Sequence, residues 1–384
     1  RAFDLLASNT VTVSNFSRGL RMLLGDLVIS SDDADQLRHR VQPLVEDDRQ
    51  YRKFRLAGLR KVMSEHTYQD RLRYLLEKVG GRVLPDDRAK VLAVGLAQSK
   101  AEAESIIAAF RRQDWPRKVL VLIADGVDLS DDELEGVTVV GLEEASEPGF
   151  LRRWECCWVA LLDPRDHYGR NYLCDLALAT RYADAAAIGK IAHFSWTSDG
   201  PVLPQGDHSY VHGGPAPWRR AMVRAADAPF SELLDAGHQG VEILVPQVLA
   251  IDEFNYCAEG EGRQVGQVVD DTDGLWTGLS LGRLQQLAEQ ATAADEMASR
   301  QLASPELDAH SLARILPVGE HADGQVRLLE ESGGLRLESG LDDHKHVYLY
   351  TTSPVPVERL FDDGTIGKFN FVVDSEMLVS LVFV

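Results

Sequence analysis

This sequence is poor in cysteine, in net basic charge and in long apolar runs. Four cysteines, of which only Cys156 and Cys157 are adjacent, fit neither a disulfide framework nor the ligand spacing of a zinc site. We therefore expect reduced thiols in a cytoplasmic protein. A formal net charge of -20 argues against a nucleic-acid surface, because a phosphate backbone is bound by clustered Lys and Arg. No apolar run approaches the roughly 20 residues that a membrane span needs.

The chain does have the length and apolar content to fold into two or three domains, with 384 residues of which 45% are hydrophobic. Apolar strand-like runs at 90–96, 118–124, 137–140 and 158–162 surround a helix-like segment at 101–113. Continuous apolar strands separated by helices predict a parallel sheet covered on both faces. Ligands of such sheets bind at the carboxyl ends of the strands.

The segments on either side of this core differ from it. Residues 48–79 form a basic amphipathic run with helical spacing, and further helices are expected at 171–184 and 279–291. From about 315, short alternating strands predict a small antiparallel sandwich, with strands at 325–329, 346–352 and 377–384. Because the first residue is Arg1 rather than Met, we expect a cut amino terminus.

The stretch D-P-R-D-H-Y-G at 163–169 places two acids directly after an apolar strand. A hard divalent cation such as Mn²⁺ or Mg²⁺ prefers carboxylate oxygens and would neutralise the diphosphate of a departing nucleotide. Asp163 and Asp166 are therefore candidate metal ligands. The structural alternative is that Asp163 caps the following turn and Asp166 caps a helix. The residues alone leave both open.

A wider stretch carries a family resemblance. The segment W-V-A-L-L-D-P-R-D-H-Y-G-R-N-Y-L-C-D-L-A-L-A-T, with A-A-A-I-G-K after it, resembles the metal-motif region of family-2 glycosyltransferases of the GT-A fold. The earlier I-I-A-A-F-R-R-Q-D-W-P-R-K-V-L-V-L-I and the later I-D-E-F-N-Y-C are similar to the opening unit and the closing strand of that domain. The resemblance covers roughly 90–260. It implies an α/β fold, with a GT-A-like mostly parallel sheet and flanking helices, and a nucleotide-sugar donor.

The amino-terminal segment carries a second resemblance. R-A-F-D-L-L-A-S-N-T-V-T-V-S-N and S-E-H-T-Y-Q-D-R-L resemble the carboxyl-terminal end of spore-maturation-type GT-B glycosyltransferases. This implies that Asp4 contacts the ribose of the donor, and that most of the GT-B domain lies upstream of this chain. The expected domains are 1–82 (GT-B remnant), 88–265 (GT-A-like), 266–312 (helical linker) and 313–384 (β-sandwich-like).

The chain departs from the family pattern at the acids. Pro164 and Arg165 stand where the family has acidic residues, and Arg165 could replace the metal by pairing with the diphosphate. Gln98 and Ser99, after the first strand, are candidates to touch the base of the donor. Asp125, after the second strand, is a candidate for the base or the ribose, and it could equally cap a turn.

Other candidates concern the acceptor. An inverting transferase needs a carboxylate to deprotonate the acceptor hydroxyl, and Glu242 is the nearest acid, with Asp235 next. A structural role for Glu242 at the start of an element is also open. Lys190 resembles the G-K of the family and would line the acceptor side, or would be a surface lysine at a strand end. The basic segment 217–224 could bind the diphosphate or an anionic acceptor, or be a solvated helix start.

Four histidines, at positions 167, 193, 208 and 212, belong to the same predicted domain. A zinc site would need a tighter set with defined supporting partners, so contact with a sugar or phosphate is the preferred interpretation.

We therefore expect an inverting glycosyltransferase that uses a nucleotide-sugar donor, with a divalent cation that the altered motif could have lost. Its acceptor would be a glycan or small molecule of the cell surface or of secondary metabolism. The alternative is a catalytically degenerate scaffold or sugar-binding module that assists an upstream GT-B half.

Overall fold

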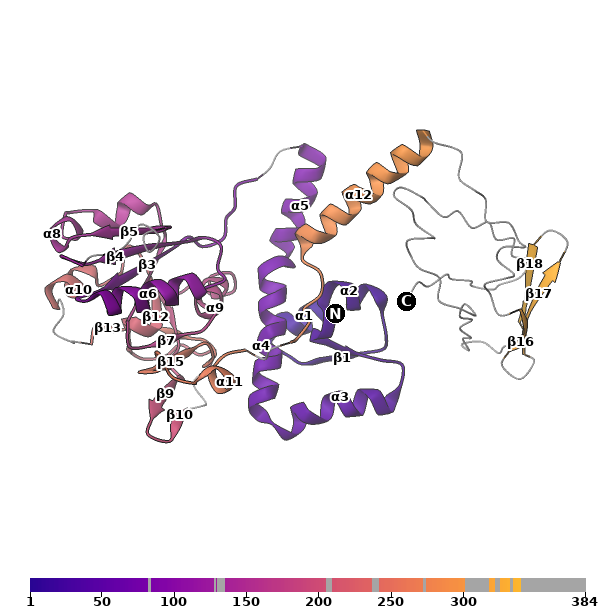
Figure 1. The fold of residues 1–384 in the computed structure, drawn as a ribbon, viewed down its shortest axis with the longest axis horizontal. Helices are drawn as coiled ribbons and strands as arrows, with labels where there is room; N and C mark the ends of the chain where they lie inside the picture. The colour runs from indigo at the N-terminus through magenta and orange to yellow at the C-terminus, as the bar shows by residue number, and fades with distance from the viewer. Residues whose placement is uncertain are drawn as a thin grey trace. The chain divides into compact units, whose positions relative to one another are not determined.

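The computed structural model describes residues 1–81, 84–127, 129, 135–204, 209–236, 242–271, 274–300, 318–321, 325–331 and 334–339. The chain, drawn in Figure 1, divides into two compact units, Arg1–Ser280 and Leu281–Val384.

The centre of the Arg1–Ser280 unit is a mixed sheet of seven strands within the described residues. Its order is β14 (Leu249–Ala250), β8 (Ala187–Gly189), β12 (Ala221–Arg224), β6 (Trp158–Leu162), β3 (Val91–Leu96), β4 (Lys118–Ile123) and β5 (Val137–Val140). Strand β3 pairs in parallel with both β4 and β6, whereas β12 runs antiparallel to β6 and β8. The predicted strands of an α/β fold are thus confirmed. The basic segment expected at 217–224 is not a solvated helix start, because Trp218 is fully buried and the second half of the segment, 221–224, forms strand β12 inside the sheet.

Helices and loops cover both faces of this sheet. On one face, α6 (Lys100–Arg112) and α9 (Tyr172–Ala179) bury side chains such as Ile106, Phe110 and Leu176. On the other face, Phe150, Trp218 and Phe230 pack on the strands. These residues come from three short helices, η2 (Phe150–Trp154), η3 (Trp218–Arg220) and α10 (Phe230–Ala236). A further short helix, α8 (Leu142–Ala145), follows β5. The helix predicted at 101–113 is confirmed, and the one predicted at 171–184 is shorter.

A second sheet contains two residues of the D-P-R-D-H-Y-G stretch. Its order is β10 (Gly200–Val202), β9 (Phe194–Thr197), β15 (Tyr256–Ala258) and β7 (His167–Tyr168). Strand β15 pairs antiparallel with β7, so the closing strand of the family resemblance lies directly against the D-P-R-D-H-Y stretch. The short strands β11 (Ala216–Pro217) and β13 (Leu244–Val245) form an additional pair, and helix α11 (Gly266–Val269) follows β15.

The amino-terminal segment begins with α1 (Ala2–Ala7), β1 (Thr12–Ser14), α2 (Arg18–Leu24), η1 (Gly25–Leu27), β2 (Val28–Ser30) and α3 (Ala34–Glu46). The amphipathic run at 48–79 then forms two helices, α4 (Asp48–Glu65) and α5 (Tyr68–Gly80). Thr67 separates them, because its side chain accepts from the N–H of Asp70 while the Asp70 carboxylate accepts from the N–H of Thr67.

Largely buried charges join helix α4 to the seven-stranded sheet and its connections, residues 88–271, which we call the sheet domain. Arg60 donates from Nε to Asp175 Oδ1 at 2.8 Å and from Nη2 to Asp271 Oδ1 at 3.1 Å. Lys190 Nζ lies 2.6 Å from Asp252 Oδ1 and 3.6 Å from Asp175 Oδ2. Burial raises the pKa of Asp252 to about 7, against the opposing charge of Lys190. We call these five residues the α4 ion cluster. Leu56 and Leu59 of α4 add apolar contacts with Phe194 and Phe254.

The Leu281–Val384 unit is described in part. It contains α12 (Leu281–Arg300) and a three-stranded antiparallel sheet of β16 (Gly319–His321), β17 (Val326–Glu331) and β18 (Gly334–Ser339). The predicted helix at 279–291 and strand at 325–329 are confirmed. The strands predicted at 346–352 and 377–384 lie outside the described residues, so the sandwich stays a prediction.

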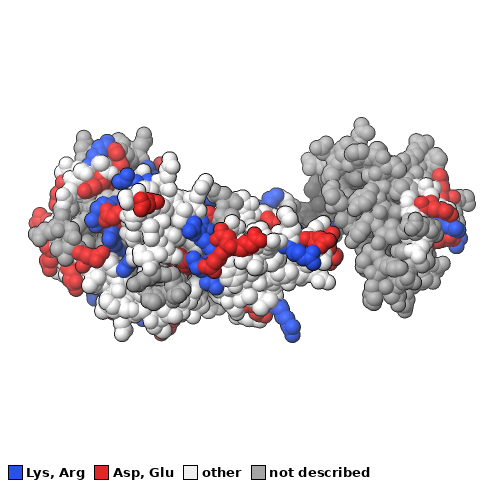
Figure 2. All heavy atoms as spheres, turned by 90° about the horizontal axis from the view of Figure 1, so that it is seen from below, with Lys and Arg blue, Asp and Glu red and all other residues white. Residues whose placement is uncertain are grey.

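On the face shown in Figure 2, Lys and Arg alternate with Asp and Glu over the Arg1–Ser280 unit rather than forming one broad basic surface. In the part of the chain that the structure describes, no helix combines the length and apolar character that crossing a membrane requires.

The α4 ion cluster predicts a large loss of stability on breaking one pair. Arg60→Met removes the cation that neutralises buried Asp175, so we expect the free energy of unfolding to fall by about 3 kcal/mol or more. Denaturation followed by tryptophan fluorescence measures this, because all six tryptophans lie in the Arg1–Ser280 unit. The matched control Arg38→Met breaks an exposed pair with Asp35 on α3 and should leave the midpoint unchanged. Equal midpoints for both variants would contradict the proposed strength of the cluster.

Candidate functional site

The turn after β6 is closed by its own arginine. Arg165 donates to Asp163 from Nε at 2.9 Å and from Nη2 at 2.7 Å, and its backbone N–H donates to the same carboxylate at 3.0 Å. Burial opposes ionisation of Asp163, but the hydrogen bonds and charge of Arg165 prevail and lower the pKa of Asp163. The guanidinium of Arg165 remains half-exposed and lies 3.5 Å from Glu259.

Asp166 belongs to the same turn, and it is only 1% exposed. Its Oδ2 accepts from the phenol of Tyr256 at 2.6 Å. Its Oδ1 accepts from Arg219 Nη1 at 2.8 Å and from the N–H of Glu259 at 2.9 Å. Burial raises the pKa of Asp166 to about 6, although the charge of Arg219 acts in the opposite direction.

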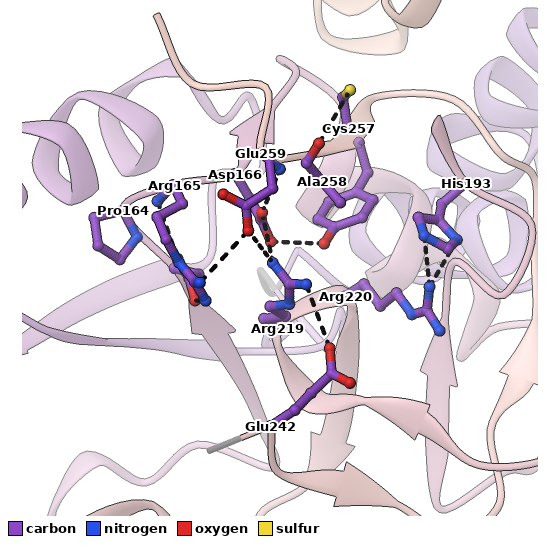
Figure 3. A network of polar contacts seen from close by, with 12 residues as sticks. Pro164, Arg165, Asp166, His193, Arg219, Arg220, Glu242, Cys257, Ala258 and Glu259 are labelled. Atoms are coloured by element: carbon purple, nitrogen blue, oxygen red, sulfur yellow. Dashed lines mark hydrogen bonds and ion pairs between the residues drawn. The ribbon is translucent and has the colours of Figure 1, made fainter. Parts of the chain in front are cut away.

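Arg219 is the centre of the charged group drawn in Figure 3. Besides Asp166, its guanidinium lies 3.3 Å from Glu242 and 3.5 Å from Glu259. The three carboxylates come from three segments: the turn after β6, the residue before Ile243 and β13, and the residue after β15. Tyr168 donates from Oη to the carbonyl oxygen of Arg219 at 2.8 Å, which fixes the backbone of η3. We call this group the Arg219 cluster, and it consists of Asp163, Arg165, Asp166, Arg219, Glu242 and Glu259.

The arrangement does not fit a divalent cation held by the two predicted aspartates. A cation needs free carboxylate oxygens, whereas both oxygens of Asp166 accept from protein donors and the fork of Arg165 covers both oxygens of Asp163. Within the described ranges, no group of three or more His, Cys, Asp and Glu could hold a metal ion. Metal binding by Asp163 and Asp166 would require these hydrogen bonds to break, and it stays an untested prediction.

The two candidate bases are placed differently. Glu242 is about half-exposed and belongs to the Arg219 cluster, so a substrate hydroxyl could reach it. Asp235 is exposed near the end of α10 and does not belong to the cluster.

Lys190 is fully buried in the α4 ion cluster. Its ammonium is bound by Asp252, which favours a structural role over the expected contact with a ligand.

The residues expected to contact the base or ribose stabilise helix starts. Asp125 accepts from the N–H of Leu142 at the beginning of α8. Ser99 accepts from the N–H of Glu102 as the N-cap of α6, and the N–H of Gln98 donates to the Glu102 carboxylate at 2.7 Å. Asp4 is exposed in the first turn of α1. Contact of these residues with a donor stays a prediction.

The three of these histidines that the structure describes do not form one group. His167 lies between Asp270, at 2.9 Å, and Arg112, at 3.2 Å. His193 contacts Arg220. His212 is exposed, and position 208 lies outside the described residues.

Sequence reasoning missed Tyr256 and Glu259, and it noted Arg219 only as part of a basic segment. The available signals were two adjacent arginines in a chain of net charge -20 and a tyrosine within the closing strand of the family resemblance.

Comparison with known proteins gives one family match, in the amino-terminal segment, and similarities to solved structures. Residues 1–77 match the profile of a family described as glycosyl transferase-like. No curated protein matches the chain. Among solved structures, the chain is similar to S. aureus TarS 1-349 in complex with UDP-GlcNAc, with 15% identity and a TM-score of 0.30 over 44% of this chain and 58% of that chain. A second structure of S. aureus TarS has 15% identity and a TM-score of 0.28, over 44% of this chain and 36% of that chain. The family match over residues 1–77 supports the expectation of a glycosyltransferase.

The buried carboxyl of Asp166 predicts a specific pH dependence. Because its folded-state pKa of about 6 exceeds the ordinary 3.8, its contribution to stability is complete below pH 3.8 and is lost as the pH rises through 6. The full contribution is about 3 kcal/mol, of which roughly 1 kcal/mol should return between pH 7 and pH 5. Thermal unfolding of the wild type and of Asp166→Asn at both pH values measures it. A stability difference that does not change with pH would show that the Asp166 pKa is not raised.

Proposed function

We propose that the sheet domain transfers a sugar from a nucleotide-sugar donor to an acceptor hydroxyl, with arginines facing the diphosphate. The observation that carries this proposal is the Arg219 cluster, in which one guanidinium bridges three carboxylates beside the carboxyl end of β6. Ligands of α/β sheets bind at this edge. The family match of residues 1–77 adds independent support for glycosyl transfer.

The arginines suit a phosphate ligand chemically. The planar guanidinium forms paired, charge-assisted hydrogen bonds with phosphate oxygens. Arg219 stands beside Asp166, where the family would hold a cation, so the site carries a fixed positive charge without one. Arg165 is half-exposed on the same cluster, and its Nη1 makes only a long contact of 3.5 Å with Glu259. Together, the two residues can offset the charge that develops on a departing diphosphate.

In the proposed reaction, Glu242 accepts the proton of the acceptor hydroxyl. The acceptor oxygen forms a bond to the anomeric carbon while the bond from that carbon to the phosphate oxygen breaks. The nucleoside diphosphate departs with the electron pair of that bond, facing Arg219 and Arg165. A single displacement of this kind inverts the anomeric configuration.

We also propose that residues 88–265 form a GT-A-like domain and that residues 1–82 are the remnant of a GT-B domain.

One observation favours a second candidate function, a sugar-nucleotide-binding module without catalysis. Every carboxylate of the Arg219 cluster is already bonded to an arginine. If these pairs persist when the donor binds, Glu242 stays paired with Arg219 instead of contacting an acceptor hydroxyl, and the domain would bind the donor without turnover.

The proposal predicts donor binding that needs Arg219 and no added metal. We expect UDP or GDP to bind in the presence of EDTA, and Arg219→Met to weaken this binding roughly tenfold or more, because a charged hydrogen-bond donor is lost. Calorimetric titration with EDTA and with manganese measures it. Arg224→Met is the matched control, because Arg224 follows in the same segment and pairs with exposed Asp184.

Since Arg219→Met leaves Asp166 without its cation, the double variant Arg219→Met/Asp166→Asn checks that lost binding does not reflect unfolding. Binding that strictly requires manganese and is lost in Asp166→Ala would instead support the predicted metal site.

Catalysis predicts a separate effect at Glu242. Glu242→Gln should retain nucleotide binding while donor turnover falls roughly 100-fold or more, because the general base is removed. Release of nucleoside diphosphate from UDP- and GDP-sugars measures the rate, and Asp235→Asn serves as the control acid outside the cluster. Nucleotide binding without turnover in the wild type would favour the non-catalytic module.

A further inference from the structure

Arg220 differs sharply in environment from its neighbour Arg219. Its side chain is half-buried, and its Nε is enclosed without a hydrogen-bond partner. Within the described part of the chain, its guanidinium forms no ion pair with a carboxylate, whereas Arg219 contacts three. Burial lowers the pKa of Arg220, which is the expected response of a cation without a close counter-charge.

His193 does not supply that counter-charge. Nη1 of Arg220 lies 2.7 Å from the His193 ring nitrogens, and His193 Nδ1 lies 2.8 Å from the carbonyl oxygen of Ile191. These contacts fit the tautomer that donates from Nδ1 to Ile191 and accepts from Arg220 at Nε2. Burial, and then the charge of Arg220, lower the pKa of His193 to about 4. The imidazole is therefore neutral at pH 7.

The backbone holds Arg220 in this position. The N–H of Lys190 donates to the carbonyl oxygen of Arg220 at 2.9 Å, and Tyr168 holds the carbonyl oxygen of Arg219. A half-buried cation costs free energy unless an anion accompanies it. Arg220 is held in this position without a bound anion, which indicates that the missing anion belongs to a ligand.

The location suggests which substrate carries this anion. In the view of Figure 3, Arg165 lies on one side of Arg219, and Arg220 and His193 lie on the other. Glu242 acts electrostatically on both Arg220 and His193. Since Glu242 is the proposed base, the acceptor hydroxyl must approach it, and the remainder of the acceptor can then lie along Arg220.

We propose that Arg220, supported by His193, binds a phosphate or carboxylate group of the acceptor, so that the acceptor is an anionic molecule. The assignment of this anion to an acceptor rests on the proposed glycosyl transfer. The oxyanion site itself rests only on Arg220 and its surroundings. The same chemistry could be supplied by the diphosphate of the donor, and the experiment separates the two sources.

The test titrates inorganic phosphate into the full chain, alone and with saturating UDP or GDP. We expect the wild type to bind phosphate in both conditions, and Arg220→Gln to bind it roughly tenfold more weakly or worse, with nucleotide affinity unchanged. The matched control Arg224→Gln should bind phosphate as the wild type does. In the wild type, phosphate should also raise the pKa of His193, followed by NMR of labelled histidine, because a bound anion offsets the charge of Arg220.

Stability provides a readout that distinguishes a binding role from a structural one. Removing an uncompensated buried charge should leave the unfolding temperature of Arg220→Gln equal to or above that of the wild type. A clearly lower temperature, or unchanged phosphate affinity, would overturn the site.

The remaining outcomes separate the sources. Competition between phosphate and nucleotide, with Arg220→Gln weakening both, would assign the anion to the donor and overturn the acceptor assignment. Phosphate binding that depends on Arg220, in a chain that binds neither UDP nor GDP, would support the oxyanion site while the proposed transfer fails.

Discussion

The paired hydrogen bonds between Arg60 and Asp175 constrain the whole Arg1–Ser280 unit. They hold helix α4 against α9, which begins three residues after the end of the D-P-R-D-H-Y-G stretch. Asp175 also accepts from the side chain of Asn255, whose own carbonyl oxygen accepts from the N–H of Gly169. The next residue, Tyr256, donates to Asp166. A continuous series of contacts thus connects helix α4 to the buried carboxylate of Asp166 in the Arg219 cluster.

The candidate site includes two adjacent arginines, Arg219 and Arg220, in opposite electrostatic conditions. Arg219 is surrounded by acids, so its charge is compensated before any ligand arrives. Arg220 is in contact with a neutral imidazole, so its charge is not. This asymmetry gives the two residues different tasks. Arg219 can exchange its carboxylate partners for a phosphate, whereas Arg220 gains a directly bonded anion only when a ligand enters. Such a site would discriminate among acceptors by charge before it does so by shape.

Local patterns predicted most of the sheet and little of the site. The strands at 91–96 and 118–123 were predictable because each is a continuous apolar run between turns. Strand β12 was missed because three arginines in and beside it gave it the character of a surface segment. The acids around Arg219 lie 23, 40 and 53 residues away in sequence, and no periodicity reveals such a meeting. Lys190 was expected to face a ligand because its G-K resembles the family motif. Its partner Asp252 lies 62 residues further on, so the local sequence does not reveal this contact.

The distribution of charge in the α4 ion cluster also bears on how such a chain can change over generations. The cation Arg60 belongs to the amino-terminal segment, and the anions Asp175 and Asp271 belong to the sheet domain. Recombination that exchanged either segment for a homologue without the matching charge would leave an ion buried alone. The two segments should therefore be inherited together, and a hybrid gene that joins pieces from different ancestors would need to replace both sides of the cluster at once.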